Sequence, residues 1–152
     1  MDKLQKYVKE AENAVQIAHH LITKTFPLST DPKILLSVLN NIRISHENIL
    51  LAVVDNEFLR PRVSPSASYI VKLDRFKRVM TEKDLLEPKE FVVIQNVESD
   101  WQTHAASDVE FARKQKLVMA DKNYQLKQLT PEKMKDYIAQ TQNMLKVLFN
   151  VK

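Results

Sequence analysis

Four histidines are the residues best suited to acid–base or metal chemistry in this sequence. His19 and His20 are adjacent in a stretch with helical periodicity, and neighbouring side chains diverge by about 100° around a helix, so the pair cannot chelate one ion. His46 lies in the middle of an apolar helical stripe, where a lone histidine is most simply a hydrogen-bonded core residue. No H-E-x-x-H or Glu-x-x-His pattern supplies a second ligand. The sequence therefore predicts neither a metal site nor a cofactor.

Arg43 lies three residues before His46 and four before Glu47. Its ordinary interpretation is an ion pair with Glu47 across the apolar face, which stabilises a helix by about 0.2–0.5 kcal/mol. A functional alternative places Arg43 and His46 together in a cleft, where they are the candidate catalytic pair.

A second candidate for catalysis is His104, which follows Glu98 and Asp100. If this segment is helical, the two carboxylates point in different directions, and Trp101 between them is most simply a core residue. The serines between residues 64 and 68 have no nucleophile-elbow motif around them. These patterns do not indicate a catalytic set, and the sequence favours a protein that is not an enzyme.

Basic residues are concentrated in one part of the chain, which we call the Arg60–Arg78 basic group. Its members are Arg60, Arg62, Lys72, Arg75 and Arg78. The last three recur at a spacing of three on one predicted helix, so the group could hold several phosphates with an affinity that falls steeply with salt. The ordinary alternative is a solvated helix face beside a basic loop, and no aromatic platform for base stacking lies nearby.

Composition bounds the remaining choices. A chain of 152 residues most simply forms one domain, here residues 1–152. The absence of cysteine excludes disulfides, thiolate metal sites and a cysteine nucleophile, and the absence of glycine excludes glycine-rich phosphate loops. We also expect tight primed hairpin turns and glycine C-caps to be missing. No secretory or membrane-spanning segment is evident, so the sequence predicts a soluble, cytoplasmic protein.

Hydrophobic periodicity predicts a mainly α-helical fold, an up-down bundle of four to five helices. The central helix is expected over Asp31–Phe58, where a broad apolar stripe requires several neighbours. A first helix from Asp2 should close at Phe26-Pro27, because the residue before proline avoids the α region. Further helices are expected at Tyr69–Met80, Pro88–Ala106 and from Pro131 onward. A capping-box spacing at Ser107 and Glu110 predicts that a helix restarts or that the chain bends there.

The segment from residue 116 to 129 lacks a clean helical period. It favours a small β-hairpin around residues 117–126 that turns at Asp121-Lys122-Asn123, where asparagine tolerates a left-handed conformation. An irregular helix that continues from Ser107 is the alternative.

The string HAASDVEFARKQKLVMADKNYQLKQLTPEKMKDYI, from His104 onward, together with the helical hairpin over residues 2–58, resembles small prokaryotic HEPN-like helical-bundle proteins. The resemblance covers most of the chain and is one of overall pattern. Active HEPN ribonucleases carry an arginine and a histidine on one helix with four to six residues between them. Here the corresponding positions before His104 hold Val97, Glu98 and Ser99, and only two residues separate Arg43 from His46. The resemblance therefore implies a catalytically inactive member.

Two functions of different classes follow from the sequence. The first is a non-enzymatic binding module that acts through contacts with a protein partner or by self-association. The alternative is an RNA-binding protein, or a degenerate HEPN-like ribonuclease, that uses the Arg60–Arg78 basic group. No residue points to a small-ligand pocket between helices.

Overall fold

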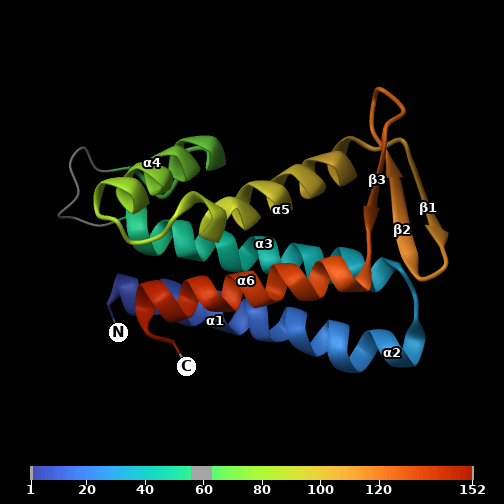
Figure 1. Cartoon of the computed structure of the whole chain (residues 1–152), viewed down its shortest axis with the longest axis horizontal. Helices are drawn as coiled ribbons and strands as arrows, with labels where there is room; N and C mark the ends of the chain where they lie inside the picture. Colours follow the sequence, from blue (N-terminus) through green and yellow to red (C-terminus); the bar gives the residue numbers. More distant parts are fainter. Residues whose placement is uncertain (1, 56–62, 152) are drawn as a thin grey trace.

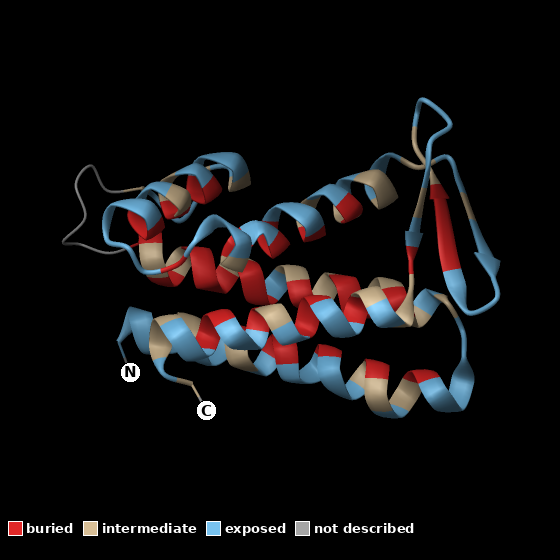
Figure 2. Cartoon of the chain, viewed as in Figure 1, coloured by how far each residue is buried: buried red, intermediate tan, exposed pale blue. Residues whose placement is uncertain are grey.

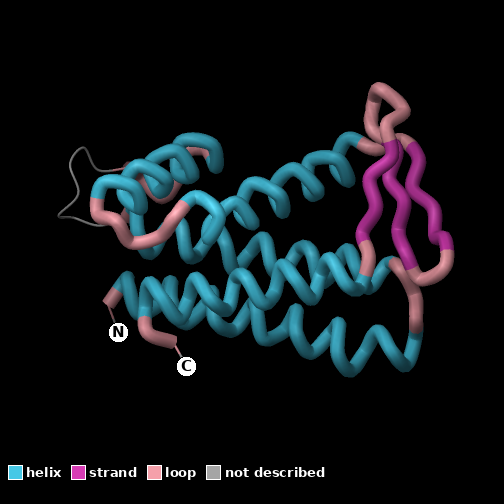
Figure 3. Tube along the Cα trace, viewed as in Figure 1, coloured by secondary structure: helices cyan, strands magenta, loops and turns pink. Residues whose placement is uncertain are grey.

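The computed structural model describes residues 2–55 and 63–151 of the chain. Within this part the protein is mainly helical, with a small three-stranded antiparallel sheet at one end (Figures 1 and 3). The predicted fold class is therefore confirmed. The helical elements in chain order are α1 (Lys3–His20), η1 (Leu21–Thr25), α2 (Phe26–Ser29), α3 (Lys33–Val54), α4 (Tyr69–Glu82), α5 (Pro88–Ala106) and α6 (Pro131–Phe149).

The central helix α3 packs against α1 and α6 on one side and against α4 and α5 on the other (Figure 1). Its first turn is fixed by Asp31, whose Oδ1 accepts a hydrogen bond from the Lys33 N–H at 3.0 Å. The helix ends at Val54, earlier than expected, because Asp55 leaves the helical conformation with φ −87° and ψ 54°. The expected last turn to Phe58 lies outside the described residues.

The first helical segment does not stop at Phe26-Pro27, so that prediction is wrong. A π-helical turn, η1, connects α1 to α2, and the Phe26 N–H bonds to the Leu21 carbonyl five residues back. A turn this wide separates the backbone from the ring of Pro27, which would clash with the carbonyl four residues before it in a regular α-helix. The segment ends one turn later, where Thr30 adopts a left-handed conformation with φ 54°.

Helix α5 begins and ends as predicted. A capping box at its start joins the side chain of Glu87 to the backbone at Glu90 and the side chain of Glu90 to the backbone N–H of Glu87. Of the two predictions for Ser107, the helix restart is wrong and the bend is present: the Ser107 hydroxyl donates to the Ala120 carbonyl at 2.7 Å, the chain bends at Asp108, and a strand follows.

The sheet has the order β1-β2-β3, formed by β1 (Val109–Arg113), β2 (Lys116–Ala120) and β3 (Leu126–Leu129). The predicted hairpin is confirmed as β2–β3, and the Asp121 carboxylate caps its turn by accepting the N–H groups of Asn123 and Gln125. The left-handed residue in this turn is Tyr124, with φ 61°, rather than Asn123. Strand β1 was not predicted.

The turn between β1 and β2 contradicts the expectation that a chain without glycine lacks primed hairpin turns. Its two residues, Lys114 and Gln115, have φ values of 49° and 66°, as a type I′ turn requires. Left-handed caps also occur without glycine, since Asn150 ends α6 with φ 58°. The chain therefore places ordinary side chains at positions that glycine usually occupies.

Burial differs across the sheet: the middle strand β2 is mostly buried, whereas β1 is mostly exposed (Figure 2). On the inner face, Leu117, Met119 and Leu129 belong to the main hydrophobic core. Val109, Phe111 and Leu126 alternate with these positions in the strand register and are exposed. Val118, which pairs with Phe111 on the same side, is buried. We call this second side, with Arg113 and Lys116 at one end, the outer sheet face. Among the described helices, none is long and apolar enough to cross a membrane.

Candidate functional site

His46 lies in the core rather than in a cleft. Its ring is fully buried, and Nε2 is 2.7 Å from the hydroxyl of Thr141 on α6. Because that hydroxyl donates its hydrogen to the Tyr137 carbonyl at 2.8 Å, Nε2 carries the proton of the neutral ring and donates to Thr141. Burial lowers the pKa of His46 to about 3. Within the described residues, Nδ1 has no hydrogen-bond partner.

Arg43 pairs with Glu98 on α5, not with Glu47 as the helix spacing suggested. The Arg43 Nε lies 2.8 Å from Glu98 Oε2, and Nη2 lies 3.5 Å from Oε1. Burial alone would lower the pKa of Arg43, but the hydrogen bond and the charge of Glu98 outweigh it, so the pKa is raised. Glu47 instead contacts Lys72 Nζ at 3.4 Å.

Trp101 contacts two of the three candidate catalytic residues, Arg43 and His104. The Arg43 Cζ lies 5.6 Å from the centroid of the indole and 5.4 Å from that of the Tyr69 ring. On the other side, the His104 ring centroid is 5.2 Å from that of Trp101. The Tyr69 hydroxyl is buried, and burial, with the nearby Glu98 carboxylate, raises the pKa of Tyr69. Arg43 and His104 are therefore neighbours of one aromatic ring, whereas His46 lies apart.

His104 is held by the first strand. Its Nδ1 lies 2.8 Å and 3.0 Å from the two carboxylate oxygens of Glu110 on β1. Glu110 is the residue that the sequence assigned to a helix cap, and this contact instead fastens the end of α5 to the sheet. With Glu98 bound to Arg43 and Glu110 bound to His104, both candidate groups take part in contacts between elements.

The Arg60–Arg78 basic group does not gather on one surface in the part that the structure describes. Arg60 and Arg62 lie outside the described residues. Lys72 is buried, with Nζ also 3.3 Å from the Pro65 carbonyl, and Arg75 is half-buried. Arg78 is exposed and lies 3.9 Å from Asp74 on its own helix. One of the three described cations is therefore freely accessible to a phosphate.

The sequence did not indicate that the carboxylate of Asp100 would be buried and bound by residues of several elements. Its carboxylate is buried and accepts the Tyr137 hydroxyl at 2.7 Å. Lys133 Nζ lies 2.9 Å from Oδ2, and Lys127 Nζ lies 3.8 Å from Oδ1. Burial, reinforced by the hydrogen bond to Asp100, raises the pKa of Tyr137. One carboxylate thus joins α5, β3 and α6.

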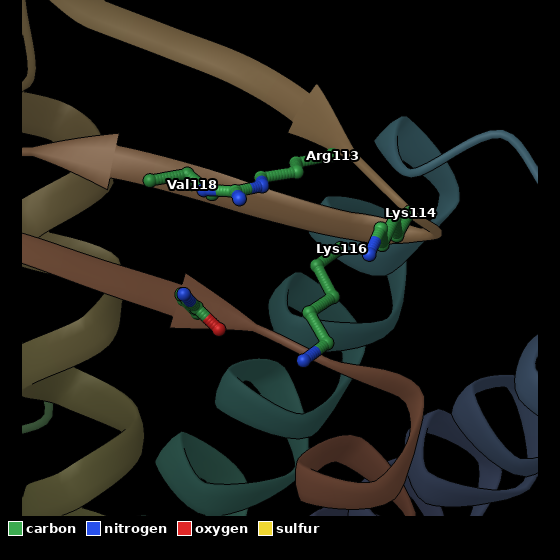
Figure 4. Close-up of a pocket in the computed structure, with 5 residues that line it drawn as sticks. Arg113, Lys114, Lys116 and Val118 are labelled. Atoms are coloured by element: carbon green, nitrogen blue, oxygen red, sulfur yellow. The ribbon is translucent and has the colours of Figure 1, made fainter.

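The outer sheet face carries a basic hollow that the sequence analysis also missed. A hollow of about 210 Å³ is lined by Arg113, Lys114, Lys116, Val118 and Gln128 (Figure 4). Figure 4 shows the cationic side chains at the β1–β2 turn, beside the end of the sheet. The signal in the sequence was the run Arg113-Lys114-Gln115-Lys116, which became informative only once Phe111 and Arg113 were known to share one strand face.

The described residues contain no group of three or more His, Asp or Glu side chains that could hold a metal ion. Comparison with protein-family models, with curated protein sequences and with solved structures finds no match to this chain. The resemblance to HEPN-like proteins therefore stays a prediction.

Proposed function

We propose that this protein is a non-enzymatic binding module and that the outer sheet face is its contact surface. The observation that carries this proposal is the exposure of Val109, Phe111 and Leu126, which are 55%, 43% and 62% exposed on one small sheet. Grouped apolar side chains left open to water at an ordered surface are typical of protein contact sites.

The positions of the candidate catalytic residues support the same proposal. Arg43 and His104 have acidic partners at 2.8 Å, and His46 bonds to Thr141 inside the core. A general acid or base has to reach a substrate proton within hydrogen-bond distance. These side chains are engaged in holding helices and the sheet together, so binding accounts for the arrangement better than turnover.

The proposal is tested with a contact-disrupting variant and a matched control. Phe111→Asp places a charge on the outer sheet face, in the middle of β1, and Ile70→Asp makes a similar change at a 78% exposed position on α4, a helix far from the sheet (Figure 1). Immobilised wild-type protein is used to capture partners, and each captured protein is purified and titrated against all three forms by calorimetry.

We expect Phe111→Asp to weaken binding at least about tenfold, as loss of a central apolar anchor does, and Ile70→Asp to leave it unchanged. Equal affinities for the wild type and Phe111→Asp would place the contact surface elsewhere. Absence of any purified partner, combined with a strictly monomeric protein, would remove the proposal.

RNA binding is the second candidate, and the basic hollow favours it. Arg113 and Lys116 lie on the same sheet face as the exposed Phe111, and cations on one face with an aromatic ring can bind a phosphate and a stacked base. The mild net charge of +4 is compatible with this alternative.

The dependence of binding on salt concentration distinguishes RNA binding from the first proposal. Binding to a single-stranded RNA should weaken steeply between low and moderate ionic strength, and exchange of Arg113 and Lys116 for glutamine should flatten that dependence. Exchange of Arg75 and Arg78 for alanine tests the Arg60–Arg78 basic group in the same assay. Absence of binding at low salt would exclude RNA as a ligand of either surface.

A further inference from the structure

The outer edge of β1 is open. Strand β1 lies at one end of the order β1-β2-β3, and no element in residues 2–55 or 63–151 pairs with its far side (Figure 1). Four of its five residues are exposed, and Glu110 is half-buried. Proteins protect such an edge with a short strand, charged side chains, a proline, a bulge or a covering segment, because its free N–H and C=O groups can pair with another strand. The described edge of β1 has no proline, bulge or covering segment, and its two charged residues are Glu110 and Arg113.

The alternation of an antiparallel ladder identifies the free backbone groups. A two-residue turn at Lys114-Gln115 is closed by the hydrogen-bonded pair on either side of it, here Arg113 and Lys116. Along β1 the residues that bond to β2 therefore alternate from Arg113. The backbone groups of Ala112 and Glu110 point away from the sheet.

Only one register lets two copies of this strand pair over their whole length. If Ala112 faces Glu110 of a second copy, the strands cross at Phe111 and all five residues of β1 are opposed. Centring the pair on Ala112 or on Glu110 opposes three residues of each strand, and the second choice places two Glu110 residues against each other. The outward groups of Glu110 and Ala112 also match in the register centred on Phe111.

Side chains in this register are complementary. Phe111 faces Phe111 of the second copy, which forms an aromatic cross-strand pair. Arg113 faces Val109, so no like charges oppose each other on the strand. Just beyond the strand ends, Asp108 approaches Lys114 of the second copy, and symmetry repeats this contact. The β1 edges of two copies are therefore complementary in their backbone hydrogen-bonding groups, their apolar side chains and their charges.

We propose that two copies of this chain associate by antiparallel pairing of their β1 edges, centred on Phe111, into a continuous six-stranded sheet. This inference rests on the proposed binding function and names the partner as a second copy. Paired five-residue strands bury less surface than a standard stable interface of about 1,200–2,000 Å². The dimer should therefore be weak and depend on protein concentration.

Charge reversal with rescue tests the register. Lys114→Glu brings two acidic groups together at each end of the pair, and Asp108→Lys brings two basic groups together. In sedimentation equilibrium we expect each single variant to raise the dimer Kd about five- to thirty-fold. The double variant Asp108→Lys/Lys114→Glu should return to within about twofold of the wild type, because the opposite charges face each other again.

A second pair of variants tests the backbone contact. Ala112→Pro removes an outward N–H while leaving the bonds between β1 and β2, as proline on an edge strand allows, and should abolish the dimer. Ala112→Val keeps the N–H and should retain it. Circular dichroism and thermal unfolding show whether the proline variant folds, and the charge variants decide the question if it does not.

The outcomes separate this inference from the proposed function. A wild type that stays monomeric at millimolar concentration, while a different protein binds the outer sheet face, overturns the inference and leaves the proposed function standing. A dimer that ignores both Ala112→Pro and the charge reversals also overturns the inference. If the protein neither self-associates nor binds any purified partner, both fail.

Discussion

Helix α3 and strand β1 use their side chains in opposite ways. Helix α3 is covered on most of its circumference, and its buried residues include Ser45, His46 and Asn48. Strand β1 has no buried residue, yet it carries Val109 and Phe111. Polar side chains are thus buried on α3, at the centre of the core, while apolar side chains are exposed to water on β1, at the edge of the sheet.

The difference between α3 and β1 separates side chains that explain the fold from side chains that indicate function. The enclosed polar side chains of α3 bond to the protein: the Ser45 hydroxyl donates to the Ala11 carbonyl at 2.7 Å, and His46 Nε2 bonds to Thr141. The exception is His46 Nδ1, which has no partner among the described residues. A buried polar group needs such a partner to offset the loss of water, so its presence explains a fold before it explains an activity. Exposed apolar side chains contribute little to the fold, which makes those of β1 the more informative set.

Truncation of a buried and of an exposed phenylalanine should have the most different effects on stability. Phe76 is fully buried and packs edge-to-face on Phe91 at 5.9 Å, so Phe76→Ala should lower the free energy of unfolding by about 3–5 kcal/mol. Phe111→Ala, on the exposed strand, should change it by less than about 0.5 kcal/mol. Urea unfolding of both variants measures the difference. Similar losses would mean that β1 takes part in the core.

Acid should act on the helical core through His46. Its pKa is 6.5 when unfolded and about 3 when folded, so the unfolded chain binds more protons between these values. The stabilisation is fully present above pH 6.5 and is lost as the pH falls toward 3, with a slope of up to about 1.4 kcal/mol per pH unit. Urea midpoints measured across this range follow the loss.

The matched variant for this test is His46→Leu, which leaves Thr141 bonded to the Tyr137 carbonyl. It should remove the His46 contribution and flatten the stability profile between pH 6.5 and 3. An unchanged slope in the leucine variant would assign the acid sensitivity to carboxylates instead.

The smallest expected effect concerns the β1–β2 turn. Gln115 has φ 66°, a conformation that costs a side chain roughly 1 kcal/mol and glycine almost nothing. Gln115→Gly should therefore raise the free energy of unfolding by up to about 1 kcal/mol. Lys122→Gly is the control, since Lys122 is exposed and has no positive φ. Thermal unfolding compares the two, and equal shifts would contradict the explanation.

Helices were predictable where apolar periodicity and a start signal coincide. Helix α5 has both, with Pro88 in its first turn, and α6 starts at Pro131 after Thr130, whose hydroxyl accepts the Lys133 N–H. Strand β1 was missed because none of its residues belongs to the hydrophobic core. Its sequence therefore has no alternation of buried apolar and exposed polar residues. The π turn before Pro27 was missed because the rule that proline ends a helix assumes a regular α-helical backbone.

The site was less predictable, since contacts between distant segments decide it. The i to i+4 rule pairs Arg43 with Glu47 on the same helix. In the structure Arg43 instead bonds to both carboxylate oxygens of Glu98, 55 residues away, and such a bidentate contact is stronger than a single ion pair. Lys72 looked like part of a basic surface, and packing of α4 buries it. Asp100 gave no local signal, because its partners come from β3 and α6.

The position of Asp100 has a consequence for cooperative opening. Its carboxylate is bound both by Lys127 in β3 and by Lys133 and Tyr137 in α6, so neither element can leave α5 without exposing the same charge. In native-state hydrogen exchange, β3 and the first turn of α6 should therefore open as one unit, with a common free energy. The outward amides of Glu110 and Ala112 should exchange independently of that unit and become protected only as the protein is concentrated.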